Sequence, residues 1–230
     1  MKEKLVVLTG AGMSAESGIS TFRDSNGLWN NYRVEDVATP EAFAANPQLV
    51  LDFYNQRRRE LLKVEPNDGH RGLVELEEIY EVHIITQNVD NLHERAGSVS
   101  VLHLHGELMK SCSVRDLNTS YDISRETPDL HLGDHDPQGH QLRPFIVWFG
   151  EAVPMIEPAI RLVESADIFV VIGTSLNVYP AAGLLNYVRN GQPIFLIDPQ
   201  HVQTARNDLH VIQAGASEGV RQLANLLRGL

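Results

Sequence analysis

Residues 5–15 read LVVLTGAGMSA, an apolar run that leads directly into a glycine-rich turn. The run at 5–9 is apolar without alternation, which is typical of a strand buried on both faces of a parallel sheet. Gly10, Gly12 and Ala15 then fit the pattern G-x-G-x-x-G/A, in which glycine lets the backbone turn tightly and approach a pyrophosphate. This stretch therefore predicts the strand, turn and helix that open a dinucleotide-binding α/β domain, although a tight turn without a ligand is the alternative.

Other apolar runs along the chain have the same character and end in small or polar residues, at 82–86, 168–173 and 194–198. Shorter runs at 99–104 and 145–148 are further candidate strands. Together they predict an α/β fold with a Rossmann-like, doubly wound parallel sheet, whose ligands bind beyond the carboxyl ends of the strands.

The segments between these strands are too long for plain crossovers and predict a smaller inserted lobe. Helices are expected at 42–62, with Pro47 opening the main one, at 69–80 and at 219–227. Residues 111–141, rich in Asp, Ser, Thr, Gly and His, predict a loop or mobile flap. The whole chain is expected to be one domain, with a large lobe at about 1–30, 81–110 and 146–230 and a small lobe at about 31–80 and 111–145.

Composition excludes several classes of protein. Among 230 residues, 19 are basic and 30 acidic, which gives a net charge of −11 and argues against a surface built to bind nucleic acid or an anionic membrane. The one cysteine, Cys112, cannot form an internal disulfide or a four-cysteine zinc site. No apolar run approaches the roughly 20 residues of a membrane helix, and no signal-peptide pattern is seen, so a cytoplasmic protein is expected. The oligomeric state stays open.

Several motifs resemble the sirtuin family, and they occur in the family's order. They are Gly10-Ala11-Gly12-Met13-Ser14-Ala15-Glu16-Ser17-Gly18-Ile19 with Thr21-Phe22-Arg23, then Gln87-Asn88-Val89-Asp90, His103-Leu104-His105-Gly106, Val147-Trp148-Phe149-Gly150-Glu151, and Gly173-Thr174-Ser175 with Val178-Tyr179-Pro180. The resemblance implies a Rossmann-like domain with a small lobe of a helical part and a zinc-ribbon-like part. It also implies an NAD-dependent deacylase that acts on acyl-lysine proteins or peptides and releases nicotinamide and O-acyl-ADP-ribose.

The resemblance assigns NAD binding to residues spread over the chain. They are Gly10, Ala11, Gly12, Ser14, Ala15, Glu16, Ser17, Gly18, Ile19, Thr21, Phe22, Arg23, Trp29, Gln87, Asn88, Val89, Asp90, His105, Gly173, Thr174, Ser175, Asp198 and Ala216. Asp198 departs from the asparagine that many sirtuins carry. An Asx-rich turn is the alternative interpretation of Asn88 and Asp90.

His105 and Asn88 are the expected catalytic residues. Histidine titrates near neutral pH, so His105 can accept a proton from a ribose hydroxyl as a general base. The carboxamide of Asn88 can order a water molecule or a ribose hydroxyl. His103 is expected to be structural.

Tyr54 and Arg57 stand at i and i+3 of a predicted helix and so share a face. A phenol and a guanidinium together can bind a carboxylate. With the small Ala38 they resemble the sirtuin branch that removes succinyl and malonyl groups; a solvated basic face at 57–59 is the alternative. Other expected substrate-binding residues are Val147, Trp148, Phe149, Gly150 and Val178, at edges that can pair with an extended peptide.

Family members usually carry two C-x-x-C pairs that hold zinc, but here Arg115 stands three residues after Cys112 and no second pair exists. The alternative is a metal site formed by His131, Asp134, His135, Asp136 and His140, but their spacing fits no tight metal template and favours a solvated loop. The sequence predicts a degenerate, zinc-free ribbon with no metal.

Other functions are compatible with the same fold. A protein ADP-ribosyl transferase would transfer ADP-ribose without deacylation, and a non-catalytic NAD or ADP-ribose sensor would bind nucleotide without releasing nicotinamide. A hydride-transferring dehydrogenase fits less well, because residues 20–25 lack the acidic strand end that would bind a ribose.

Overall fold

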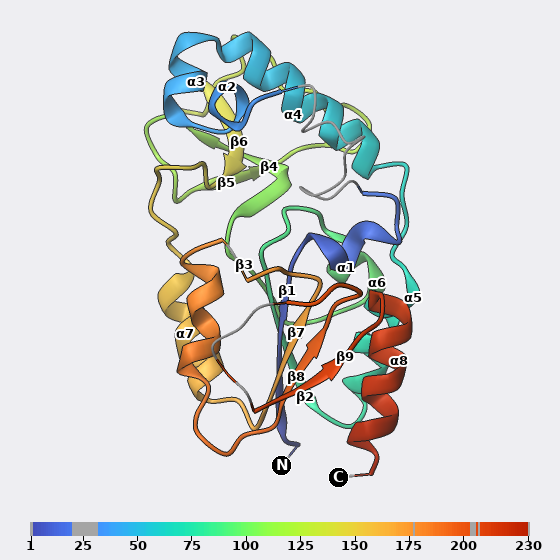
Figure 1. The fold of residues 1–230 in the computed structure, drawn as a ribbon. Coiled ribbons are helices and arrows are strands. Elements are labelled where there is room, and N and C mark those ends of the chain that lie inside the picture. The colour runs from blue at the N-terminus through green and yellow to red at the C-terminus, as the bar shows by residue number, and fades with distance from the viewer. Residues whose placement is uncertain (1, 20–31, 177, 203–205, 207, 230) are drawn as a thin grey trace.

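The computed structural model describes residues 2–19, 32–176, 178–202, 206 and 208–229. The chain forms a larger part around a parallel sheet and a smaller part with its own sheet, which lie at the bottom and top of Figure 1. Within the described residues, every helix is too short or too polar to span a bilayer.

The larger part is built on a six-stranded sheet whose neighbouring strands are all parallel. Its strands, in spatial order, are β3 (Val101–His103), β2 (Glu81–Thr86), β1 (Lys4–Thr9), β7 (Ile168–Ile172), β8 (Ile194–Ile197) and β9 (Leu209–Ile212). Counted along this sheet, the order is 3-2-1-4-5-6, that of the doubly wound dinucleotide-binding fold. The predicted Rossmann-like α/β fold is therefore confirmed.

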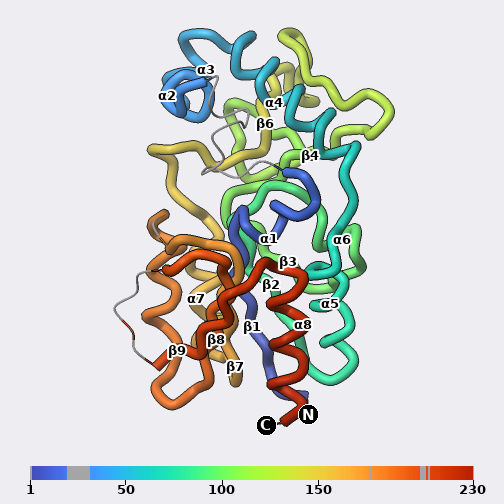
Figure 2. The backbone as a smooth tube through the Cα atoms, turned by 45° about the vertical axis from the view of Figure 1, so that its right-hand side comes forward, coloured from blue at the N-terminus to red at the C-terminus, as the bar shows by residue number. Residues whose placement is uncertain are grey.

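Helices cover both faces of this sheet, as Figures 1 and 2 show. Leu5 and Val7 of β1 face the side covered by α5 (Asp68–Leu76) and α8 (Ala216–Leu227). Val6 and Leu8 face the side covered by α7 (Ile156–Glu164) and the 3₁₀ helix Ala181–Tyr187. All four side chains are completely buried, and each contributes about 1.5–3 kcal/mol on burial. This two-sided burial explains the unbroken apolar run in the sequence.

The smaller part combines helices with a three-stranded antiparallel sheet in the order β5 (Ser120–Asp122), β4 (Gly106–Ser113), β6 (Leu142–Ile146). The helices are α2 (Val34–Val37), α3 (Pro40–Ala45) and α4 (Pro47–Leu61). Phe53 and Tyr54 of α4 pack with Leu108, Ile146 and Trp148 in a core of their own.

Several predicted boundaries were wrong for identifiable reasons. Pro47 opens the main helix, α4, as expected. The range expected at 42–62 is nevertheless two helices, because Asn46 leaves helical geometry and caps α4 by accepting from the Leu49 backbone N–H at 3.2 Å. The helix expected at 69–80 ends at Leu76, and the one expected at 219–227 begins at Ala216. Residues 68–76 pack on the six-stranded sheet rather than in the small lobe.

The segment expected to be a loop or flap contains regular structure. In the range 111–141, the first residues belong to β4 and residues 120–122 form β5. The strand expected at 145–148 is β6, which spans 142–146 and belongs to the antiparallel sheet. β9 was missed, because its burial is incomplete and its apolar signal is short.

Buried polar contacts tie the loop before residue 131 to α4. Asn55 exchanges two hydrogen bonds with the Leu130 backbone, at 3.0 and 2.9 Å. Arg58 is completely buried, contacts Asn55, and donates to the Pro128 carbonyl at 2.6 Å. These contacts hold a segment that has few apolar side chains of its own.

Asp136 organises the turn that leads into β6. Its Oδ1 accepts from the backbone N–H groups of Gln138 and His140, at 2.9 and 2.8 Å. Burial opposes the charge of this carboxylate, but hydrogen bonds from the His140 backbone and the Ser113 side chain lower the pKa of Asp136 to about 2. Within the described residues, no three His, Cys, Asp or Glu side chains come together as a metal site.

We predict that the small lobe folds without zinc. Elemental analysis should find far less than one zinc per chain, and chelators should leave the melting temperature unchanged. Asp136→Asn should lower the melting temperature by several degrees, because the neutral amide oxygen accepts the Gln138 and His140 backbone hydrogen bonds less strongly than the carboxylate does. A stoichiometric, tightly held zinc would contradict the prediction.

Candidate active site

The glycine-rich loop after β1 lies directly against the loop after β7. Gly10 donates to the Ile172 carbonyl at 3.0 Å, and Gly12 donates to the Gly173 carbonyl at 2.9 Å. A Cβ on Gly12 would lie only 2.7 Å from the Gly173 Cα, and one on Gly10 would lie 2.7 Å from the Thr174 Cβ. Only glycine fits at these positions, and β1 and β7 are the two strands between which the order of the sheet reverses.

A hydrogen-bonded network joins this loop to the residues that follow β2. The Asn88 amide donates to the Gly10 carbonyl at 3.0 Å and to Ser14 Oγ at 3.1 Å. Ser14 Oγ in turn donates to Asp90 Oδ2 at 2.9 Å. Gln87 Nε2 donates to Thr174 Oγ1 at 3.1 Å. The structure thus brings together predicted site residues from three separate loops.

His105 follows β3, and its ring nitrogen Nδ1 lies 3.0 Å from the Gln87 carbonyl oxygen. A carbonyl can only accept, so the neutral ring carries its hydrogen on Nδ1 and leaves Nε2 unprotonated. Burial lowers the pKa of His105, and the hydrogen bond to Gln87 offsets part of that effect. The arrangement presents a neutral imidazole whose Nε2 can accept a proton.

Asp90 is a buried carboxyl group that the site keeps well hydrogen-bonded. Burial raises its pKa, while hydrogen bonds from the Leu92 backbone and Ser14 and the charge of His103 act in the opposite direction. Its two oxygens accept from different neighbours, Oδ1 from Leu92 N at 3.1 Å and Oδ2 from Ser14 Oγ. The carboxylate is therefore fixed in orientation.

Other residues expected to bind NAD lie around this network. Glu16 accepts from the Ser217 backbone at 3.2 Å, which brings α1 (Ala11–Ala15) to the start of α8 at Ala216. Ser17 accepts from Asn67 at 3.1 Å. Asp198 is buried at the end of β8 and accepts from the Gln200 backbone at 2.8 Å.

The remaining expected NAD residues have simpler places in the structure. Gly18 has a positive φ of 93°, Ile19 packs on the small-lobe core, and the Val89 carbonyl accepts from Leu108 N at 2.7 Å. Ser175 is partly buried after β7. Thr21, Phe22, Arg23 and Trp29 lie outside the described residues.

Tyr54, Ala38 and Trp148 belong to one buried cluster in the small lobe. Trp148 Nε1 donates to the Tyr54 oxygen at 3.0 Å. Burial raises the pKa of Tyr54 to about 12, so the phenol is neutral and its own hydrogen can be donated to another acceptor. Arg57 lies one turn further on; burial lowers its pKa, while Tyr54, Glu60 and Asp90 favour its charge.

An ion pair that the sequence did not reveal holds this cluster. Arg143 and Glu151 form two hydrogen bonds, at 2.6 and 3.0 Å, with both side chains largely buried. The Arg143 guanidinium carbon lies 3.4 Å from the centre of the Trp148 ring. Glu151 also accepts from the Trp148 backbone at 2.8 Å. The sequence offered only a match of Glu151 to a family segment as a signal.

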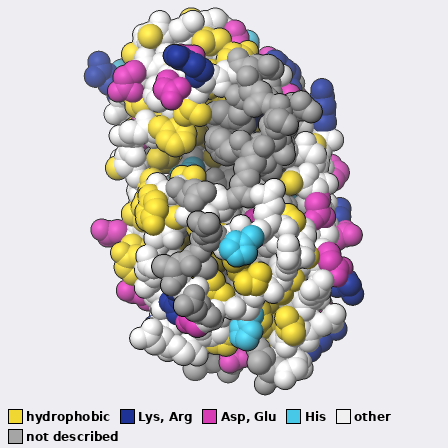
Figure 3. Space-filling view, in the orientation of Figure 1, with side chains coloured by type: hydrophobic (Ala, Val, Ile, Leu, Met, Phe, Trp, Pro, Cys, Tyr) yellow, Lys and Arg dark blue, Asp and Glu magenta, His cyan; other side chains and the backbone are white. Residues whose placement is uncertain are grey.

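The expected peptide-binding segments lie where the two parts of the chain meet. Val147 donates to the His105 carbonyl at 2.9 Å, and Phe149 donates to the Ala38 carbonyl at 3.0 Å. Gly150 has a positive φ of 90°. Phe149 and Val178 expose hydrophobic side chains. In Figure 3, hydrophobic side chains gather along the left edge between the upper and lower parts, while most charged side chains lie near the outline.

The fold and the site define an α/β protein of the dinucleotide-binding class, and comparison with known proteins makes this specific. The Sir2 family pattern matches residues 10–180. A protein of Bacteroides thetaiotaomicron named NAD-dependent protein deacylase is 62% identical over 229 residues, which cover 98% of each chain. One of Helicobacter pylori with the same name is 56% identical over 198 residues, 86% of this chain and 85% of that protein. The chain belongs to the Sir2 family, the sirtuins.

Solved structures agree in fold over the whole chain. A Sir2 homologue in complex with NAD superposes with a TM-score of 0.88 and 42% identity, covering 99% of this chain and 90% of that chain. A Sir2 protein bound to a deacetylated peptide and 3'-O-acetyl ADP-ribose gives a TM-score of 0.77 at 33% identity, over 98% of this chain and 94% of that one.

We predict that His105 is neutral at pH 7 and protonated on Nδ1. Its ring resonances should titrate below the ordinary value of 6.5, because burial disfavours the imidazolium. Nitrogen chemical shifts measured by NMR above that pH should identify Nδ1 as the protonated atom. A titration above 6.5, or a hydrogen on Nε2, would contradict the geometry.

Proposed function

We propose that this protein is an NAD-dependent lysine deacylase that removes succinyl and malonyl groups, and also acetyl groups, from protein lysines. The products are nicotinamide and O-acyl-ADP-ribose. The observation that carries the choice of acyl group is the pair formed by the buried Tyr54 and the partly buried Arg57. Tyr54 contacts Trp148, and the charge of Arg57 is favoured by Asp90.

The residues present fit NAD at the switch point of the sheet. Gly10 and Gly12 leave no side chain between the backbone and a nucleotide, and the structure has no room for a Cβ there. Gln87, Asn88 and Asp90 offer amide and carboxylate groups at the end of β2, suited to ribose hydroxyls and a carboxamide. When bound, NAD supplies the ribose carbon that receives the acyl oxygen.

His105 is placed to act as the general base. With its hydrogen on Nδ1 held by the Gln87 carbonyl, Nε2 can accept the proton of a ribose hydroxyl. The lowered pKa keeps the ring neutral at physiological pH. Asn88, fixed by Gly10 and Ser14, would orient the same hydroxyl or a water molecule.

Tyr54 and Arg57 suit the far end of a succinyl or malonyl chain. The indole of Trp148 occupies one side of the Tyr54 oxygen, which leaves the phenolic hydrogen for a carboxylate. Arg57 can add a two-point contact. The small Ala38, in the same cluster, leaves room for a longer acyl group. An acetyl group, which has no charge, would use only the apolar walls.

The proposal is tested by incubating the protein with NAD and matched acetyl-, malonyl- and succinyl-lysine peptides and following the masses of all products. His105→Ala should reduce acyl removal by about 10²–10⁴-fold, the usual cost of losing a general base, with NAD binding nearly intact. Transfer of labelled ADP-ribose to protein without deacylation would favour a transferase. Nucleotide binding without nicotinamide release would favour a sensor.

We predict that Arg57→Met lowers desuccinylation about 30-fold or more relative to deacetylation. Removing one partner of a buried charge pair costs about 2–5 kcal/mol, and an acetyl group makes no such pair. The measurement is the ratio of kcat/KM on succinyl- and acetyl-peptides of one sequence. Arg59→Met is the matched control, because Arg59 is exposed and pairs with Asp129; it should change neither activity.

Tyr54→Phe should also lower the ratio of kcat/KM on succinyl-peptide to kcat/KM on acetyl-peptide, but by less than Arg57→Met does. It removes one neutral hydrogen bond, which is worth about 1 kcal/mol. Equal losses of both activities in Arg57→Met would mean that the arginine supports the lobe and does not recognise a carboxylate.

A further inference from the structure

Three consecutive backbone carbonyls of the loop after β2 are held by residues 103–108, which run from the end of β3 into β4. The Gln87 carbonyl faces His105 Nδ1, the Asn88 carbonyl faces His103 Nδ1 at 3.1 Å, and the Val89 carbonyl accepts from Leu108 N. The position of the Asn88 side chain therefore depends on His103, a residue that does not itself reach the glycine-rich loop.

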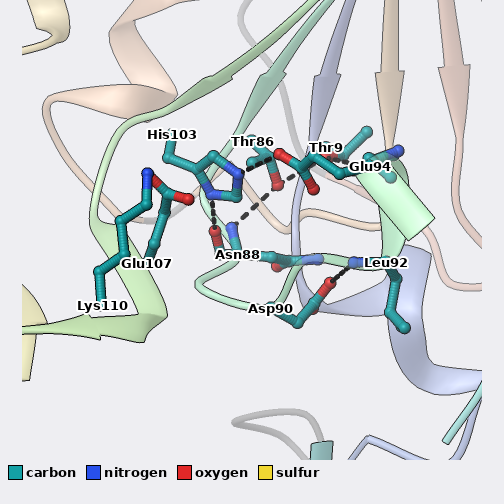
Figure 4. A network of polar contacts seen from close by, with 10 residues as sticks. Thr9, Thr86, Asn88, Asp90, Leu92, Glu94, His103, Glu107 and Lys110 are labelled. Carbon is teal, nitrogen blue, oxygen red and sulfur yellow. Dashed lines mark hydrogen bonds and ion pairs between the residues drawn. The ribbon is translucent and has the colours of Figure 1, made fainter. Parts of the chain in front are cut away.

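Both ring nitrogens of His103 face groups that can only accept a hydrogen bond. Nδ1 lies 3.1 Å from the Asn88 carbonyl oxygen, and Nε2 lies 2.7 Å from Glu94 Oε1 on α6 (Leu92–Ala96). Figure 4 shows the ring between these two oxygens. A neutral imidazole has one N–H and can satisfy only one of them. The geometry therefore requires a doubly protonated, positively charged ring.

The surroundings favour this charge. Burial acts against it, but the hydrogen bond and charge of Glu94, the charge of Glu107 and the Asn88 carbonyl raise the pKa of His103 above its ordinary value. Three other charged or titratable groups lie close by: Asp90, Lys110 and His93. Lys110 pairs with Glu107. The pKa of His93 is lowered by burial and by its histidine neighbours. The charge of His103 also favours the ionised form of Asp90.

We propose that Glu94 and His103 are positioning residues that hold the Asn88–Asp90 loop for the reaction, and that the loop loosens when His103 loses its proton. This inference rests on the proposed deacylase function. Neither residue touches substrate in this account, because both act through the backbone of Asn88.

The direction of the pH effect follows from the raised pKa. The two charge-assisted contacts of His103, to Glu94 and to the Asn88 carbonyl, form a clamp on the loop. This clamp is complete at and below a pH equal to the ordinary pKa of histidine, and it is lost as the pH rises through the raised pKa of His103. The neutral ring keeps its hydrogen on one side only, and a neutral hydrogen bond is roughly half as strong as a charge-assisted one. Activity should therefore fall several-fold on the alkaline side to a plateau, without vanishing.

The test is the pH profile of kcat/KM for NAD in the wild type, Glu94→Gln and His103→Gln, with the imidazole titrations followed by NMR. Glu94→Gln keeps the shape of the side chain but removes its charge, so the alkaline midpoint should move to lower pH by about one unit, the lower end of the effect of an adjacent opposite charge. His103→Gln can still donate to Asn88 but cannot titrate, so this alkaline step should disappear.

Glu81→Gln is the matched control. Glu81 pairs with His83 at 3.0 Å on β2, but the other nitrogen of His83 faces the Ser100 hydroxyl at 2.7 Å, which can donate or accept. That pair needs no imidazolium and does not contact the loop, so its loss should leave the profile unchanged.

An alkaline midpoint that stays the same in Glu94→Gln, or that persists in His103→Gln, would overturn the inference. If the wild type removes no acyl group, the proposed function fails instead. The inference is then decided by NMR alone, since the Asn88 side-chain amide should follow the titration of His103. An Asn88 amide that does not respond would overturn it.

Discussion

The contact between two backbone segments, Gly10–Gly12 and Gly173–Thr174, is the constraint on which the site depends. These loops leave β1 and β7, adjacent strands whose connections run in opposite directions along the sheet. With no Cβ at Gly12, the chains approach closely enough for a hydrogen bond from Gly12 to Gly173. The same approach places Thr174 within reach of Gln87, so the third loop is joined to the first two. Three loop backbones therefore meet at one edge of the sheet, the place where doubly wound folds bind their ligands.

Two adjacent carbonyl groups, those of Gln87 and Asn88, then assign different states to two histidines at and just after the end of β3. His105 has one acceptor beside it and is buried, so it is neutral with a defined hydrogen. His103, two residues earlier, has an acceptor at each nitrogen and a carboxylate among them, so it is charged. The different roles proposed for the two histidines thus come from their partners and not from residue type.

Buried polar contacts join the segments of the small lobe. Asp136 closes the turn before β6, Asn55 and Arg58 hold the segment at 128–130, and Arg143 with Glu151 supports Trp148. These contacts bring a small antiparallel sheet and α4 together. They also place the Trp148 indole on the Tyr54 oxygen, which connects the stability of the lobe to the proposed acyl pocket.

The amino-acid sequence by itself determined the buried strands, the glycine-rich turn and the family, because those depend on patterns within a few residues. Only the tertiary structure decided the roles of the three arginines of α4. Arg57 lies near Tyr54, Arg58 is fully buried on backbone carbonyls, and Arg59 is exposed beside Asp129. The antiparallel sheet, β9 and the clamp between Glu94 and His103 were likewise beyond local patterns. The physical reason is that a polar side chain's state is set by its partners, and most partners here come from distant parts of the chain.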